Sequence, residues 1–204
     1  MTQPLLRADG LPAGLRERKK LKTRLAIQEH AFRLFREQGY ARTTVEQIAE
    51  AAEVSPSTFF RYFPTKEDVV LFDAFDPLVI DAFRRQPASL GPIAAMREAM
   101  HEVFGALPQA ALDDQRERGQ LVYSVPELQS AWMADLLRTA HVMSDMLAER
   151  TGLSPEDPRI AMFTGALIGA ITAALLPTLA GDGADFVVEI DRALDFLEGG
   201  LALS

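Results

Sequence analysis

The chain has 204 residues, 48% of them apolar and 25% charged, which is typical of folded, water-soluble proteins. It contains no cysteine, which excludes disulfide bonds, thiol catalysis and thiolate metal sites and suits a reducing cytoplasm. The formal net charge is −8, but residues 1–66 carry 12 Lys and Arg against 7 Asp and Glu, a net +5, whereas residues 67–204 carry 9 against 22, a net −13. This asymmetry indicates a basic, nucleic-acid-binding module joined to an acidic remainder.

The beginning of the chain predicts a disordered tail and a cytoplasmic protein. Residues 1–15 mix proline, glycine and charged residues without a period, so we expect no regular structure there. They also lack the long apolar core and the small-residue cleavage site of a secretory signal.

A long helix is predicted over residues 15–38. Apolar residues recur there at the spacing of one helix face, at Ile27, Ala31, Leu34 and Phe35. Gly39 follows where a left-handed C-terminal cap is expected.

Two short helices are predicted next. Thr43 and Glu46 have the spacing of a capping box, so the second helix is expected to begin there. Ser55 is a good N-cap and Pro56 suits the first helical position, so the third helix is expected over residues 56–63. Two short helices joined by a tight turn and braced by a longer first helix form a helix-turn-helix.

The third helix has the composition of a recognition helix. Its N-terminal end carries the small polar residues Ser55, Ser57 and Thr58, which leave room to enter the major groove. Phe59 and Phe63 supply apolar anchors, because so short a helix is not stable alone. A fourth helix is predicted to follow, from the capping pair Thr65 and Asp68 through Phe75.

These residues resemble the DNA-binding domain of the tetracycline-repressor (TetR) family over about residues 16–72. The matching positions are Thr23, Arg24, Ile27, Ala31, Leu34, Phe35, Glu37, Gly39 and Tyr40, then Thr43, Thr44, Val45, Ile48, Ala49, Ala52, Val54, Ser55, residues 58–64 and Lys66. The resemblance implies an all-α protein of about nine helices. An N-terminal three-helix helix-turn-helix DNA-binding domain (residues 16–66) would precede a helical ligand-binding and dimerisation domain (residues 67–204).

The resemblance and helix geometry together imply which residues contact DNA. The candidates for phosphate contacts are Thr44, Tyr62 and Lys66, with Arg42 directed to the backbone or the minor groove. The candidates for reading bases are Ser57, Thr58, Phe60 and Arg61. Thr43 and Ser55 complete the candidate DNA-binding set. If Lys66 binds phosphate, Lys66→Ala should weaken binding on all sequences and lower the salt slope by about one.

Three residues depart from the family pattern. Glu53 stands where the family often has glycine in the turn, so we expect a positive φ costing roughly 1 kcal/mol. Phe60 replaces a common tyrosine, which removes a hydroxyl contact but retains the ability to touch a thymine methyl group. Ser57 replaces a common glycine and adds a hydroxyl near the base edges.

The remainder of the chain predicts five further helices, near residues 93–107, 110–122, 127–150, 158–180 and 185–203. The last two are the candidates for a homodimer interface. Small residues recur every four positions on the first of them, at Gly165, Gly169 and Ala173. The second carries an apolar stripe of Phe186, Val187, Ile190, Leu194 and Leu197.

A pocket for a small-molecule effector is expected among the other helices. Soft and aromatic side chains suit an adaptable, lipophilic site, and the candidates are Met96, Met100, Phe104, Leu121, Trp132, Met133, Leu137, Met143 and Phe163. His101, Arg138 and His141 are candidate polar anchors for the ligand.

Residues 160–180 are long and apolar enough to span a membrane, but they are rich in Ala, Gly and Thr and have mainly acidic flanks. A helix buried by its own domain core and a dimer interface is therefore expected, and no membrane partner. The sequence has no convergent catalytic set, phosphate-binding glycine motif or metal-ligand spacing, so we expect no enzyme, no cofactor and no metal.

The favoured function is therefore a ligand-responsive repressor released from a palindromic operator by a small lipophilic effector. An activator or a ligand-independent DNA-binding protein remains an alternative. A helical interaction module that does not bind DNA is a third, disfavoured by the small polar residues of the third helix.

Overall fold

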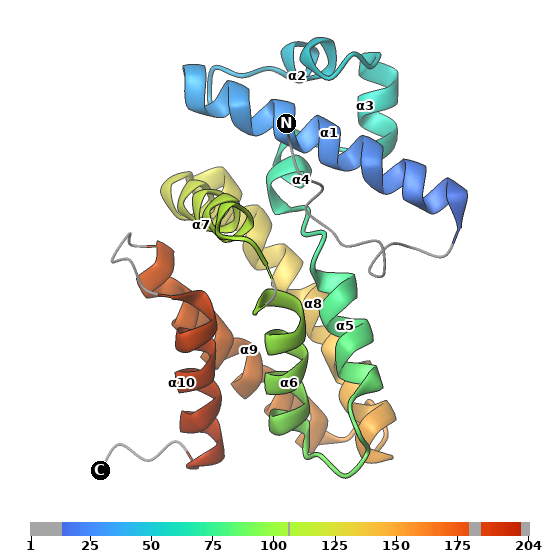
Figure 1. Ribbon diagram of the computed structural model, residues 1–204, viewed down its shortest axis with the longest axis vertical. Coiled ribbons are helices and arrows are strands. Elements are labelled where there is room, and N and C mark those ends of the chain that lie inside the picture. Colours follow the sequence, from blue (N-terminus) through green and yellow to red (C-terminus); the bar gives the residue numbers. More distant parts are fainter. Residues whose placement is uncertain (1–13, 106, 180–184, 201–204) are drawn as a thin grey trace. The chain divides into compact units, whose positions relative to one another are not determined.

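The computed structural model describes residues 14–105, 107–179 and 185–200 (Figure 1). Within these ranges the chain forms ten helices and no strand, which confirms the predicted all-α fold class. The predicted tail falls almost entirely on residues 1–13, which lie outside the described residues. The chain divides into two compact units, Met1–Ala74 and Phe75–Ser204.

The N-terminal unit consists of α1 (Leu15–Gln38), α2 (Val45–Ala51), α3 (Pro56–Tyr62) and α4 (Lys66–Leu71). α1 contacts each of the three short helices, and α2 contacts α3. Each helix contributes at least one fully buried side chain to a common core, among them Ile27, Ile48, Phe59 and Val69. Burial of each stabilises the unit by roughly 1.5–3 kcal/mol, so the short helices depend on one another.

The second helix begins one residue later than predicted. Thr44 is its N-cap: its hydroxyl accepts a hydrogen bond from the Gln47 N–H at 3.3 Å, and the Gln47 side chain accepts one from the Thr44 N–H at 2.9 Å. The predicted capping box of Thr43 and Glu46 is therefore wrong. The two pairs have the same spacing, but Thr43 is only 1% exposed and its hydroxyl donates to the Gly39 carbonyl at 2.9 Å.

Polar side chains of α1 hold the C-terminal ends of α3 and α4, where helix carbonyls lack internal partners. The side-chain amide of Gln28 donates to the carbonyls of Val69 at 2.9 Å and Phe72 at 2.8 Å. Arg24 donates to the Tyr62 carbonyl at 3.3 Å, and its guanidinium lies 5.0 Å from the centre of the Phe72 ring. The sequence analysis predicts neither of these interhelix hydrogen-bonding roles.

The helix predicted from Thr65 through Phe75 is interrupted. α4 ends at Leu71, Phe72 is extended with ψ 115°, and a separate helix, α5 (Asp76–Arg85), follows. Pro77 lies in the first turn of α5, where its missing N–H is tolerated, and that residue could not have continued the preceding helix. The described residues therefore hold ten helices rather than about nine. Because α4 contacts α1, the boundary between the units follows residue 74 rather than residue 66.

The C-terminal unit contains α5 and five longer helices: α6 (Pro92–Phe104), α7 (Gln109–Ser124), α8 (Pro126–Thr151), α9 (Pro158–Leu179) and α10 (Phe186–Glu198). Proline occupies the first turn of α5, α6, α8 and α9, which makes each start well defined. α6 packs between α5 and α10, and α9 packs against both α8 and α10 (Figure 1).

An ion-pair network joins α6 to α10. Arg97 contacts Asp191 at 3.0 Å, Asp195 at 2.8 Å and Glu198 at 3.0 Å, and His101 contacts Asp191 at 2.8 Å. The Arg97 side chain is only 19% exposed, so these contacts are less screened by solvent than ordinary surface pairs.

The face of α9 that points away from its own unit is apolar and uncovered. An 18-residue window, Pro158–Leu175, has a mean hydropathy of 1.5, so by length and composition alone this helix could cross a membrane. Only 22% of the window is buried within the chain. Met162, Gly165, Gly169 and Ala173 lie on the exposed side. The sequence predicts that the domain core and a dimer interface together bury this helix. The structure shows the side that packs on the core, and burial of the other side in a dimer stays a prediction.

Candidate nucleic-acid interface

Ser55 begins the recognition helix α3. Its hydroxyl accepts a hydrogen bond from the Thr58 N–H at 3.1 Å and donates to the Thr58 hydroxyl at 2.9 Å. The side chains of Ser55 and Thr58 are thus hydrogen-bonded to each other at the first turn of α3. Thr58 is one of the predicted base-reading residues, and its hydroxyl accepts this local hydrogen bond.

One exposed face of α3 gathers the other three predicted base readers. Ser57, Phe60 and Arg61 are spaced at i, i+3 and i+4, which places them on the same side of a helix, and all three are exposed. Phe60 is 50% exposed although its ring is large and apolar. We call these three residues the reading face.

The opposite side of α3 is anchored in the core. Phe59 is fully buried and Phe63 is 2% exposed. Phe60 meets Phe59 edge to face, with ring centres 5.5 Å apart and planes at 86°. The guanidinium of Arg61 lies 5.2 Å from the centre of the half-buried Tyr62 ring. The exposed aromatic ring is thus held by a buried one, so the reading face has a defined shape.

The α1–α2 loop supplies the predicted residues that precede α2. Thr44 is exposed at the start of α2. Arg42 is also exposed, and its Nε donates to the Gln38 carbonyl at 2.6 Å. Thr43 lies apart from this surface, because its buried hydroxyl donates to Gly39 and accepts from the Gln38 amide at 3.2 Å. Its side chain therefore supports the loop instead of facing outward.

Lys66, a predicted phosphate ligand, is half-buried and makes hydrogen bonds within the N-terminal unit. Its Nζ donates to the Tyr40 carbonyl at 2.9 Å and the Thr43 carbonyl at 3.1 Å. The ammonium also lies 4.0 Å from the centre of the Tyr40 ring. The neighbouring Glu67 accepts a hydrogen bond from the Tyr40 hydroxyl at 2.9 Å.

Glu67 is the ionisable group most clearly altered by this loop. Burial acts to raise the pKa of its carboxyl group. Hydrogen bonds from its backbone, the Tyr40 hydroxyl and Thr65, together with the positive charge of Lys66, outweigh burial, so the pKa of Glu67 falls below its ordinary value.

The turn between α2 and α3 contains the positive φ angle that was predicted for Glu53. Glu53 has φ 55° and is the non-glycine residue with positive φ among the described residues. The prediction for this position is confirmed. The side chain is exposed, so the turn carries both a strained backbone and a negative charge directly before the recognition helix.

The predicted effector-pocket residues divide between the core and the surface of the C-terminal unit. Met96, Met100 and Phe104 are buried on α6. The half-buried members of the set are Leu121, Trp132, Met143 and Phe163. Met133 and Leu137 are 59% and 67% exposed on α8, so within one chain they do not line an interior pocket.

The predicted polar anchors also lie at the surface. His101 pairs with Asp191, Arg138 pairs with Asp135, and Nδ1 of His141 lies 2.6 Å from the Leu137 carbonyl oxygen. Each partner belongs to the surface of the same unit, so these side chains form local contacts and do not converge on one site.

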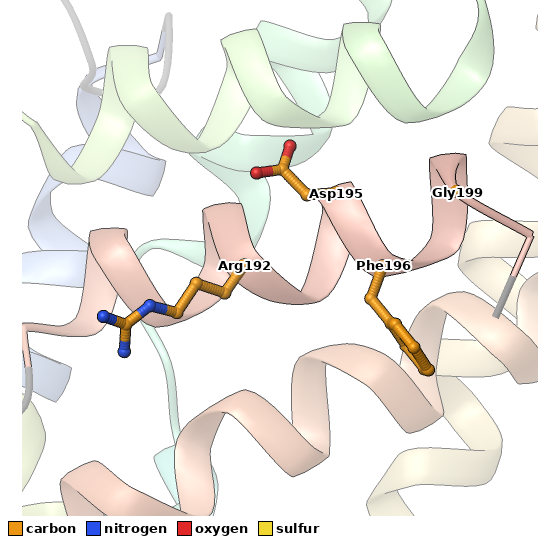
Figure 2. Close-up of a pocket in the computed structure, with 4 residues that line it drawn as sticks. All are labelled: Arg192, Asp195, Phe196 and Gly199. Carbon is orange, nitrogen blue, oxygen red and sulfur yellow. The ribbon is translucent and has the colours of Figure 1, made fainter. Parts of the chain in front are cut away.

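A shallow hollow lies instead along α10. Its lining residues are Arg192, Asp195, Phe196 and Gly199, none of which the sequence had singled out (Figure 2). The apolar stripe predicted on this helix faces inward, since Ile190 and Leu194 are fully buried, whereas Val188 and Phe196 are 46% and 42% exposed.

Comparison with known proteins identifies the class. Residues 27–71 match bacterial regulatory proteins of the tetR family, and residues 90–202, more than half of the chain, match the MftR C-terminal domain. The HTH-type transcriptional regulator TcmR of Streptomyces glaucescens is 37% identical over 169 residues, covering 78% of this chain and 73% of that protein. The chain belongs to the tetR family of transcriptional regulators.

Two solved structures share the fold. FadR of Thermus thermophilus, a TetR family transcriptional repressor in complex with lauroyl-CoA, has a TM-score of 0.56 and 24% identity, covering 89% of this chain and 96% of that chain. SmeT in complex with triclosan has a TM-score of 0.54 and 19% identity, covering 85% of this chain and 90% of that chain. These two structures show the fold alone. The family match and the identity to TcmR show that the protein is a DNA-binding transcriptional regulator with a helical C-terminal domain, and its family is not one of enzymes, as predicted.

Proposed function

We propose that this protein is a homodimeric repressor that binds a palindromic operator and leaves it when a small lipophilic effector binds the C-terminal unit. The observation that carries the proposal is the reading face on α3. Ser57, Phe60 and Arg61 offer a hydroxyl, an apolar ring and a guanidinium on one exposed helix side. These groups match the hydrogen-bonding and methyl groups of base edges in the major groove.

Phosphate contacts are assigned to groups that flank the reading face. Thr44 is exposed at the start of α2, Arg42 is exposed in the α1–α2 loop, and the half-buried Tyr62 lies at the end of α3. The exposed first turns of α1 add positive charge through Arg16, Arg18, Lys19, Lys20 and Lys22. This distribution explains why a chain of net charge −8 would bind a polyanion through one unit only.

A homodimer would cover the uncovered face of α9. Gly165 and Gly169 have no atom within 4 Å of the position that a Cβ would occupy, so their surface is open in the single chain. A smooth, apolar face of this kind suits close approach of the same helix from a second copy. Two recognition helices would then be available for two half-sites.

The effector is proposed to be lipophilic. Met96, Met100 and Phe104 present soft and aromatic side chains to the interior of the C-terminal unit, where the half-buried Trp132 and Phe163 add aromatic surface. In their solved structures FadR binds lauroyl-CoA, which joins an apolar acyl chain to the charged coenzyme A group, and SmeT binds triclosan, a largely apolar molecule. Both ligands are suitable first probes for this chain.

The test is a fluorescence anisotropy titration of the full-length protein on duplexes from its own upstream region. The salt concentration is fixed and scrambled competitor DNA is in excess, because salt governs such affinities. We expect saturable binding that survives competition, with two chains or a multiple of two per site. Lauroyl-CoA or triclosan is then added to the complex, and release of the duplex would support the effector assignment.

A pair of arginine variants separates specific from general binding. Arg61→Ala should weaken binding to the operator by about 10-fold or more and relax its sequence preference, since a base contact is worth about 1–3 kcal/mol. Arg84→Ala is the control, because Arg84 lies in the C-terminal unit and pairs with Glu149 at 3.0 Å. Identical behaviour of both variants on every duplex would contradict the proposed reading face.

A further inference from the structure

Lys66 connects the beginning of α4 to the loop that precedes α2. Two of its three N–H groups are used by the carbonyls of Tyr40 and Thr43, at 2.9 and 3.1 Å. Its ammonium also faces the Tyr40 ring at 4.0 Å, a cation–π geometry. The side chain is half-buried, so these charge-assisted bonds are partly shielded from water.

The loop that Lys66 binds is held from several sides. Tyr40 is 8% exposed, its ring packs 5.2 Å from that of Phe35, and its hydroxyl donates to Glu67. Consecutive residues of α4, Lys66 and Glu67, therefore grip the backbone and the hydroxyl of the same tyrosine. The loop is fixed to α4 as well as to α1.

The bond from Lys66 to the Thr43 carbonyl links α4 to the start of α2. The Thr43 carbonyl belongs to the peptide that leads directly into Thr44, the N-cap of α2. A bond to that oxygen fixes the position from which Thr44 and the first turn of α2 extend. Lys66 therefore acts on the start of α2 across 23 residues of sequence.

We propose that Lys66 is a positioning residue for DNA binding, which holds the α1–α2 loop and the start of α2 from α4, and is not a phosphate ligand. This inference rests on the proposed operator binding. It gives the first residue of α4 an internal partner, so any change in the position of that residue would be transmitted to the Thr43 carbonyl, which directly precedes Thr44.

The two roles predict different salt dependences. A lysine that neutralises a phosphate releases counterions, and its removal lowers the slope of log affinity against log salt by about one. A lysine that contacts no phosphate leaves that slope nearly unchanged when it is replaced, although the affinity falls if the loop that it holds is loosened. We expect Lys66→Met to weaken operator binding about tenfold, equivalent to about 1.4 kcal/mol, with an unchanged slope.

Arg42→Met is the matched control. Arg42 lies in the same loop and is exposed; its Nε donates to the Gln38 carbonyl, and its replacement removes a surface charge of equal sign. We expect this variant to lower the slope by about one. Lys66→Arg should restore part of the affinity lost in Lys66→Met, because a guanidinium can also donate to two carbonyls and stack on Tyr40.

Hydrogen exchange of the free, full-length protein supplies an independent measurement. In Lys66→Met, the amides of Thr43 and Ile48, which bond to the carbonyls of Tyr40 and Thr44 at 3.2 and 3.1 Å, should lose protection. Amides in the middle of α1 and in α6 should keep theirs, which would distinguish a local loosening from unfolding of the unit.

The outcomes separate the two proposals. A wild-type protein that binds no operator would overturn the proposed function itself. A wild-type protein that binds, with a Lys66→Met variant whose slope falls by about one and whose loop protection is unchanged, would overturn the positioning role and restore Lys66 as a phosphate ligand.

Discussion

The two units of the chain expose very different surfaces. Among the described residues of the N-terminal unit, the large apolar side chains that are clearly exposed are Leu15, at the start of α1, and Phe60, on the reading face. In the described part of the C-terminal unit seven such side chains are exposed, namely Tyr123, Met133, Leu137, Val142, Met162, Val188 and Phe196. The described part of the first unit thus buries nearly all of its large apolar side chains, and Phe60 is its exposed aromatic ring. The second unit leaves a larger apolar surface uncovered in the single chain.

Both units use polar side chains to join their helices. In the N-terminal unit, side chains such as Gln28 and Lys66 donate to backbone carbonyls near the ends of other elements. In the C-terminal unit, Arg97 joins α6 to α10 through ion pairs, and Arg150 of α8 donates to the carbonyls of Gln86 and Leu90. The two units therefore differ in the apolar surface that they expose rather than in the kind of polar contact that holds their helices.

The largest expected effect comes from the uncovered face of α9. Gly169→Arg should leave the single chain folded, because the space at Gly169 is open, but in a twofold dimer it would place two charges in an apolar interface. We expect monomers by analytical ultracentrifugation and operator binding weakened by about 100-fold or more, since the two half-sites would no longer be bound together. Ala88→Arg, on an exposed loop, is the control. A fully dimeric Gly169→Arg protein would show that the second copy docks elsewhere.

The carbonyl contacts of Gln28 should matter next. Gln28→Ala removes two hydrogen bonds and leaves the carbonyls of Val69 and Phe72 without these partners, so the N-terminal unit should lose about 2 kcal/mol of stability. Native-state hydrogen exchange of α1 and α4 would measure the loss. Glu29→Ala, at the adjacent exposed position, should change it little. Equal losses of stability in the two variants would mean that the hydrogen bonds of Gln28 to Val69 and Phe72 contribute no measurable stability.

A smaller effect is expected from the methyl group that Phe60 is proposed to touch. Replacing single thymines of the operator by deoxyuridine removes only that methyl, and at one position per half-site we expect a loss of about 1 kcal/mol. The same replacement should cost nothing on the Phe60→Ser protein, and a double-mutant cycle gives the coupling. Additive effects at every thymine would remove Phe60 from the base-reading set.

Removing the strained backbone of the α2–α3 turn should stabilise the N-terminal unit. Glu53→Gly relieves the positive φ and should stabilise the N-terminal unit by about 0.5–1 kcal/mol. Glu53→Gln keeps the strain while removing the charge, so it should leave stability nearly unchanged and act only on DNA affinity. Thermal unfolding of both variants would distinguish the backbone effect from the charge effect.

The smallest effect is a dependence on pH near Glu67. Its pKa is lowered in the folded protein, so its contribution to stability is present above the ordinary value near 4.5 and is lost as pH falls through the lower, folded value. Tyr40→Phe removes one hydrogen bond that lowers this pKa. The stability difference between wild type and Tyr40→Phe should therefore be constant near neutral pH and narrow below about pH 4.5. A difference that widens in acid would show that the bond favours the protonated carboxyl group.

The sequence predicted most of the N-terminal unit because its signals are local. Ser55, Pro56 and Thr65 define helix starts through contacts only a few residues away, and the structure has them where expected. The failures have equally specific causes. Thr43 and Thr44 offer the same capping pattern, and the choice depends on Gln47 and on burial of Thr43 by α1.

Contacts between residues that are distant in the chain could not be predicted from the sequence. The partners of Lys66 lie more than 20 residues away, and a lysine at a helix start has the same pattern whether it faces solvent or a loop. In the C-terminal unit, Met96 and Met133 read alike as soft apolar residues, yet one is buried and the other is 59% exposed. Composition identifies residues that need covering, but it does not say whether the same chain, a second copy or a ligand covers them.

Phe60 has a consequence for chemically modified DNA. A phenyl ring offers no hydrogen-bond donor or acceptor, so its contact depends on the C5 methyl group and not on the base that carries it. 5-Methylcytosine presents that methyl at the same place in the major groove as thymine does. If Phe60 reads a thymine methyl, a methylated cytosine at that position would mimic the preferred base, and the regulator would be sensitive to cytosine methylation of its operators.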